Sequence, residues 1–126
     1  MPKNEETIHR TRKPNVAHFI GSLRIGGAEN QAALLLNTMD PERFNRHVIV
    51  MHEGGAGFSD SLAPDVAFYN IAYRRRNSPA ALHRLYRYLS DNRIDVLHCH
   101  MYLASIQGAV IGRLAAVPVI VTSEHG

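Results

Sequence analysis

Two histidines two residues apart, His98 and His100, stand in an apolar segment of this 126-residue chain, with Cys99 between them. On an extended strand both imidazoles leave the same face and the thiol leaves the other. Such a pair could bind a metal ion, and His125 would complete a three-histidine zinc set. Because this spacing is unspecific, we expect no metal and favour a structural, hydrogen-bonded role for His98.

A pair of adjacent glycines offers a second place for chemistry. Gly26 and Gly27 lack side chains, so their amides can approach a phosphate or sugar closely. A helix that begins after them would point its positive end at the same spot. The segment matches neither the G-x-G-x-x-G dinucleotide pattern nor the P-loop pattern. An ordinary tight turn between a strand and a helix is an equally good interpretation.

Near the end of the chain, Glu124 and His125 place a carboxylate beside an imidazole. The imidazole can donate to a hydroxyl or a phosphate near neutral pH. Adjacent residues on a strand point apart, so we do not expect these two to bond each other. The alternative role for Glu124 is a partner for a helix end or a loop.

Five short, β-favouring apolar segments alternate with helical patterns along the chain. The predicted strands cover residues 16–20, 46–51, 65–71, 94–100 and 117–122. The predicted helices follow the glycine pair and end near residue 40, and then cover residues 58–63, 79–92 and 103–115. Such alternation implies βαβ units with right-handed crossovers. It predicts an α/β fold with a doubly wound, mainly parallel, Rossmann-like sheet.

The helix over residues 79–92 has a clear start and a clear buried side. Ser78 can cap its free amides, and Pro79 suits the first helical position. One stripe at the spacing of a buried helix face follows, made of Leu82, Leu85 and Leu89.

Ligands of open parallel sheets bind at the carboxyl ends of the strands, where strand order reverses. The predicted strand ends lead into residues 21–29, 98–100 and 123–126. The glycine pair, the two close histidines and the Glu124-His125 pair are therefore expected at one edge of the sheet.

Composition narrows the class of protein further. With 45% hydrophobic and 20% charged residues, the length suits one globular domain. The net charge of +3, before eight histidines are counted, is too modest to predict nucleic-acid binding. The single cysteine cannot form an internal disulfide, and no apolar stretch suits a signal peptide or membrane span, so a cytoplasmic location is expected. Three arginines at residues 74–76 predict a solvated face, with peripheral membrane contact as the alternative.

Together these segments resemble the N-terminal domain of the retaining glycosyltransferase family 4, which has the two-domain GT-B architecture. Residues 18–29 (HFIGSLRIGGAE) resemble the family's first strand and its G-G-A-E loop. Residues 95–100 (DVLHCH) resemble its D-hydrophobic-hydrophobic-H-x-H strand. Residues 112–118 followed by residues 122–126 resemble the segment that ends in its active-site histidine.

The resemblance implies a hexosyltransferase-type activity, typical of polysaccharide biosynthesis, in a cleft between two Rossmann-like domains. A nucleotide-sugar donates the sugar, and the acceptor is a glycan, a lipid-linked molecule or a small molecule. Gly26 and Gly27 would face the donor diphosphate and sugar, and His125 would be the catalytic residue that contacts the transferred sugar. The other implied binding residues are Ala28, Glu29, His100 and Glu124. No cofactor beyond the nucleotide-sugar is expected.

We expect residues 1–14 to be a disordered leader and residues 15–126 to be the acceptor-side domain, truncated at its C-terminus. The family's E-x7-E carboxylates and main nucleoside contacts lie in a second domain, and no position here can receive them. The chain alone is therefore expected to be inactive, with a second glycosyltransferase domain in trans as a possible partner. The alternatives are a non-catalytic nucleotide- or partner-binding module and a small metalloprotein that uses His98, His100 and His125.

Overall fold

The structure, a computed structural model, describes residues 12–22, 36–52, 63–71, 78–100 and 102–123. In chain order, its elements are β1 (Asn15–Ser22), β2 (Asn45–His52), β3 (Ala67–Asn70), α3 (Pro79–Asp91), β4 (Val96–His100), α4 (Tyr102–Leu114) and β5 (Val119–Ser123). Residues 36–38 are helical, in agreement with a predicted helix that ends near residue 40. The predicted helix over residues 58–63 falls almost wholly outside the described residues.

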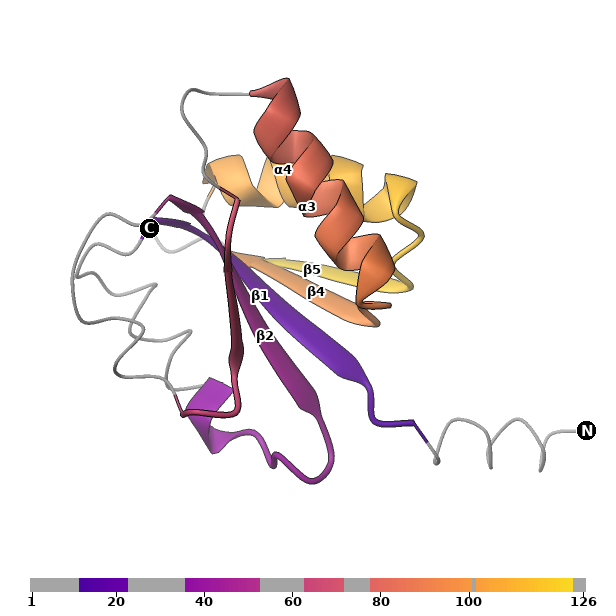
Figure 1. Cartoon of the computed structure of the whole chain (residues 1–126). Helices are drawn as coiled ribbons and strands as arrows, with labels where there is room; N and C mark the ends of the chain where they lie inside the picture. The colour runs from indigo at the N-terminus through magenta and orange to yellow at the C-terminus, as the bar shows by residue number, and fades with distance from the viewer. Residues whose placement is uncertain (1–11, 23–35, 53–62, 72–77, 101, 124–126) are drawn as a thin grey trace, which may run out of the picture.

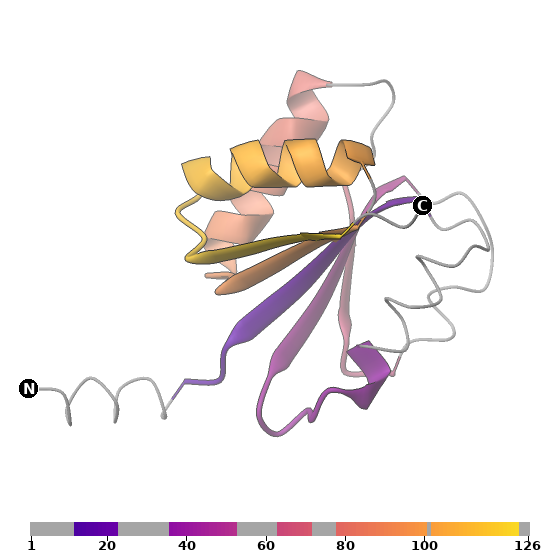
Figure 2. The ribbon, with the colours of Figure 1, turned by 180° about the vertical axis from the view of Figure 1, so that it is seen from behind.

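The five strands form one parallel sheet in the order β3-β2-β1-β4-β5. The chain moves outward from β1 through β2 to β3 and then crosses back to β4 on the other side of β1. Strand order therefore reverses between β1 and β4. Helices α3 and α4 lie together on one face of the sheet, as both Figure 1 and Figure 2 show. The predicted Rossmann-like α/β fold is confirmed.

The main core lies between the sheet and these two helices. Phe19 and Leu97 from the sheet and Leu85 and Leu89 from α3 are almost completely buried there. Cys99 joins them, which confirms that its side chain leaves the face opposite the neighbouring histidines. Burial raises the pKa of the Cys99 thiol to about 12, so this cysteine is an inert core residue.

Helix α3 begins as predicted. The Ser78 hydroxyl accepts a hydrogen bond from the Ala81 amide at 3.4 Å, and Pro79 is the first helical residue. The buried side is shifted by one residue at its start, because Ala81 is fully buried whereas Leu82 is half-buried. Neighbouring residues of a helix point only 100° apart, so a sequence pattern can assign the first buried position to the residue next to the correct one.

Both helices end in the same backbone motif. The amide of Ile94 donates to the carbonyl of Leu89, and the amide of Val117 donates to the carbonyl of Gly112. Such bonds close a Schellman motif around a residue in the left-handed region. That residue is Arg93 after α3, with φ 50°, and Ala116 after α4, with φ 60°. Each helix is thereby turned directly into the strand that follows it.

The amino ends of the strands are held together by ion pairs. The carboxylate of Asp95 accepts from the backbone amide of Asn15 at 2.8 Å and pairs with Arg12 at 2.8 Å. The guanidinium of Arg46 is buried, pairs with Asp65 and donates to the carbonyl of Leu36 at 2.7 Å. The aspartate of the D-hydrophobic-hydrophobic-H-x-H pattern is therefore a structural residue that joins the starts of β1 and β4.

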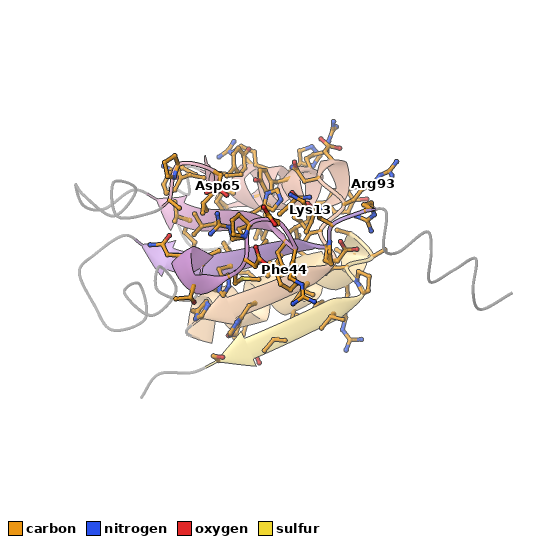
Figure 3. All side chains as sticks on the ribbon, turned by 90° about the horizontal axis from the view of Figure 1, so that it is seen from below. Lys13, Phe44, Asp65 and Arg93 are labelled. Carbon is orange, nitrogen blue, oxygen red and sulfur yellow. The ribbon has the colours of Figure 1, made fainter. Side chains whose placement is uncertain are left out.

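A cavity of about 330 Å³ lies at these amino ends. Lys13, Phe44 and Asp65, which line it, are labelled in Figure 3, the view onto the sheet from below. The Lys13 ammonium donates to the carbonyl of Pro41 at 2.9 Å, so the last residues of the predicted leader contact the domain. Residues 1–11 lie outside the described part of the chain.

Candidate functional site

Strand pairing brings three histidines together on the sheet face that α3 and α4 leave uncovered. In the parallel register, His18 of β1 lies opposite His98 of β4. His100 is two residues further along β4 and lies opposite Ser123 of β5. Because residues two apart share a face, all three imidazoles leave the same side of the sheet. The strands that carry them flank the point where strand order reverses, which is where open α/β sheets bind ligands.

The three rings are in direct contact. His18 Nδ1 and His100 Nε2 share a hydrogen bond of 2.8 Å. The rings of His98 and His100 stack with centroids 4.1 Å apart and planes 22° apart. The ring centroid of His18 lies 5.0 Å from that of His98. One ring nitrogen from each histidine can be chosen so that all three lie within 4.8 Å of one another.

Ser123 ties the cluster to the neighbouring strand. Its hydroxyl lies 2.7 Å from His98 Nε2 and forms a hydrogen bond with it. This contact fixes the orientation of the His98 ring, which is half-buried. The expected structural, hydrogen-bonded character of His98 therefore agrees with its geometry.

Burial controls the charge of the cluster. His18 is 3% exposed and His100 is 1% exposed. Removal from water, and then the proximity of His100 and His98, lower the pKa of His18 to about 3. His18 is consequently neutral at neutral pH. A neutral imidazole has one nitrogen that donates and one that accepts, so it can hydrogen-bond a hydroxyl or bind a cation.

Of the predicted site residues, the structure describes His100 alone, and it places this histidine at the carboxyl edge of β4. The remaining predicted site residues lie outside the described part of the chain: Gly26, Gly27, Ala28, Glu29, Glu124 and His125. Their roles stay predictions. The metal set of His98, His100 and His125 is likewise untested at its third member.

His18 and Ser123 were not identified from the sequence. His18 is a single polar residue within an apolar strand, which local patterning does not distinguish from a satisfied core histidine. A signal existed, because in a doubly wound sheet the first strand commonly lies next to the fourth. That adjacency, applied to the two histidine-containing strands, would have paired His18 with His98.

The histidine cluster and the fold together define the class of this domain. A parallel sheet with a switch point between β1 and β4, and polar side chains gathered beside it, is a Rossmann-like ligand-binding domain. The family model for glycosyltransferase family 4 matches residues 25–126, more than half of the chain, so the protein belongs to that family. A comparison with curated proteins found no match.

Two further features of this domain concern its surface groove and the character of its helices. A groove of about 650 Å³ runs along β5 and is lined by Ala109, Arg113, Val117, Pro118, Ile120 and Thr122. Within the described residues, no helix has the length and apolar character needed to cross a bilayer.

Proposed function

We propose that this chain is the acceptor-side domain of a GT-B glycosyltransferase that moves a sugar from a nucleotide-sugar to a glycan, lipid-linked or small-molecule acceptor. The observation that carries the proposal is the family match over residues 25–126 on a sheet whose switch point bears His98 and His100. Family membership implies donor and acceptor binding in general. We propose the donor sugar, the acceptor and the pathway only at the level of chemical class.

In this proposal, residues of the G-G-A-E segment contact the donor, and His125 contacts the transferred sugar. The amides of Gly26 and Gly27 approach the diphosphate, because nothing larger than hydrogen stands on their α-carbons. His125 hydrogen-bonds a sugar hydroxyl. His100, at the carboxyl end of β4, lines the cleft and takes part in donor or acceptor binding, with its ring oriented by the bond to His18.

The proposed transfer needs a second domain. Positive charge develops on the sugar in the transition state, and it must be stabilised while the leaving diphosphate and the acceptor are held in place. A surface on one side of the cleft cannot enclose all three groups. We therefore propose that this chain alone is inactive and acts with a second α/β domain. A cytoplasmic location is a separate part of the proposal.

An exposed apolar surface supports the proposal of further polypeptide at β5. On α4, Val110 is 55% exposed and Leu114 is 66% exposed, and on β5, Val119 is 48% exposed. Val119 pairs with Val96 and shares the face of His98, so the exposed apolar side chains at β5 stand on both faces of the sheet. Large exposed apolar side chains are typical of a surface that another protein segment covers. The non-catalytic alternative shares this feature, because a binding module would use the same edge to dock its partner.

The first test is a thermal-shift titration of the purified chain with nucleotide-sugars and free nucleoside diphosphates, followed by an assay of sugar transfer. We expect one class of donor to raise the melting temperature by a few degrees at millimolar concentration, in proportion to ln(1 + [L]/Kd). The shift should be lost in Gly27→Val, because the valine side chain would occupy the space of the phosphate. It should be reduced in His125→Ala.

The control is His83→Ala, which removes an exposed histidine from α3 and should leave the shift unchanged. Sugar transfer by the chain alone, lost in His125→Ala, would refute the need for a second domain. A shift with free nucleotides alone, equal in Gly27→Val, would favour the non-catalytic nucleotide-binding module.

A further inference from the structure

We propose that the cavity at the amino ends of β1, β2 and β3 binds a neutral sugar, at a site separate from the proposed donor and acceptor cleft. Its volume of about 330 Å³ lies at the lower end of the range for small-molecule sites. Asn15 and Ser22 mark the two ends of β1, about 23 Å apart at the rise of a strand. A small ligand in this cavity therefore cannot reach the carboxyl edge of the sheet.

The strand register creates this cavity. β2 begins at Asn45, whereas β3 begins at Ala67, which pairs with His47 two residues further along β2. The first residues of β2 therefore have no ladder partner in β3, and a notch is left at this corner of the sheet. Phe44, just before β2, and Asp65, just before β3, both line it. The parallel ladder thus fixes the two segments that face each other across the notch.

Asp65 provides a fixed hydrogen-bond acceptor. Its carboxylate pairs with the guanidinium of Arg46, whose side chain is 2% exposed and also donates to the carbonyl of Leu36 at 2.7 Å. The hydrogen bond from Arg46 is the main cause that holds the pKa of Asp65 below its ordinary value, so this carboxylate is ionised at neutral pH. The Asp65 side chain is itself 55% exposed, so its oxygens can accept from a ligand in the cavity.

Lys13 provides hydrogen-bond donors close to this acceptor. Its ammonium has three N–H groups, and one of them donates to the carbonyl of Pro41 at 2.9 Å. The positive charge of Lys13 also helps to lower the pKa of Asp65, because the two groups are near each other. Asn45 is exposed and lines the same cavity, and its side-chain amide can donate and accept.

These opposite charges select the class of ligand. An anion would be repelled by Asp65, and a cation would be repelled by Lys13 and Arg46. His47 adds no charge at neutral pH, because burial lowers its pKa. A hydroxyl group can donate to a carboxylate and accept from an ammonium. A neutral ligand with several hydroxyl groups therefore suits both kinds of partner.

Phe44 supplies an apolar surface beside these polar groups. Its side chain is half-buried and lines the same cavity. The face of an aromatic ring carries partial negative charge, so polarised C–H groups pack favourably against it. A sugar ring presents C–H groups on its faces and hydroxyl groups around its rim. The combination of Phe44 with Lys13 and Asp65 therefore points to a sugar rather than to another neutral polar molecule.

The test is an NMR titration of the full chain, without nucleotide, with the methyl glycosides of glucose, galactose and mannose. At least one of them should bind saturably at millimolar concentration and shift amide signals at the amino ends of β2 and β3. Inorganic phosphate and glycine, an anion and a zwitterion, are the comparison ligands and should not compete. Absence of binding by all three glycosides would overturn the proposal, and so would displacement of the sugar by phosphate or glycine.

Variants of the cavity identify the site. Phe44→Leu and Lys13→Gln should each weaken sugar binding at least about fivefold, and Asp65→Asn at least about tenfold. The matched controls are Tyr86→Leu and Arg93→Gln, which change another half-buried aromatic residue and another exposed basic residue outside the lining of the cavity. Both should bind the sugar as the parent chain does. Circular dichroism checks that each variant is folded.

Asp65→Asn is the variant at risk of unfolding, because it leaves the buried Arg46 without its carboxylate partner. The exposed Lys13 and the half-buried Phe44 keep the test decisive. Equal sugar affinity in folded Phe44→Leu and Lys13→Gln variants would overturn the proposal.

The site is independent of the proposed sugar transfer. Gly27→Val and His125→Ala should leave sugar binding in this cavity unchanged, so failure of this site and failure of the proposed glycosyltransferase function are distinguishable. Sugar binding that is lost in His125→Ala but kept in Phe44→Leu would place the sugar in the proposed cleft and overturn the assignment to the amino-end cavity.

Discussion

His47 lies on the helix-covered face of the sheet, where its Nδ1 is 2.7 Å from the Tyr88 hydroxyl. Burial lowers the pKa of His47 from its ordinary value of 6.5. The folded state therefore keeps this imidazole neutral at a pH where the unfolded chain has already bound a proton. As pH falls below about 6.5, the free energy of unfolding should decrease, with a slope of up to about 1.4 kcal/mol per pH unit from this group.

Urea unfolding at several pH values between about 7.5 and 5 measures this slope. The His47→Gln variant should lose less stability over that range than the parent chain, because glutamine does not titrate. His83→Gln removes an exposed histidine and serves as the control. A slope that is equal in His47→Gln and the parent chain would show that the acid sensitivity comes from other groups.

Helix α4 packs closely on the sheet because it carries glycine where the contact is tightest. A methyl group on Gly108 would lie 2.1 Å from the sulfur of Cys99 and 3.4 Å from the ring of Phe19. Gly108→Ala should therefore destabilise the protein by about 1–3 kcal/mol through overpacking. The gain of about 1 kcal/mol that alanine brings to a helix interior offsets part of this loss. Chemical denaturation measures the difference.

Removing the sulfur of Cys99 should relieve the clash with a side chain at position 108. In Cys99→Ala the sulfur is absent, so adding Gly108→Ala to that background should cost less than it does in the parent chain. The double-mutant cycle is expected to give a favourable coupling of at least about 1 kcal/mol. Additive effects of the two substitutions would mean that the helix backbone, rather than the sulfur, sets the distance.

As a whole, the molecule presents different surfaces at the two edges of its described sheet. At one edge, on β5, Val119 is 48% exposed and Val121 is 41% exposed, both on the sheet face that α4 does not cover. Unpaired strand edges with apolar side chains promote association. We expect sedimentation equilibrium to detect concentration-dependent self-association of the chain. Val121→Lys should weaken it at least about tenfold, or about 1.4 kcal/mol.

The opposite edge supplies the control. Ala67 is exposed on β3, so Ala67→Lys adds the same charge to the other side of the sheet. It should leave the association unchanged. If both lysine variants dissociate the complex equally, net charge rather than the apolar β5 edge is responsible.

The sequence by itself determined features that depend on neighbouring residues. The start of α3 at Ser78 and Pro79 follows from capping chemistry. The opposite directions of His98 and Cys99 follow from the two-residue period of a strand. The alternation of elements predicted the parallel α/β fold, and the motifs at the strand ends predicted the family and His100 as a residue of that edge.

Only the tertiary structure decided which distant segments meet. His18 and His100 share a hydrogen bond across 82 positions of sequence, and Arg12 pairs with Asp95 across 83 positions. Local patterns carry no information about such partners, because strand order is set by how the whole sheet buries its two faces. That order placed His18 beside His98, although the two histidines lie 80 positions apart in the sequence.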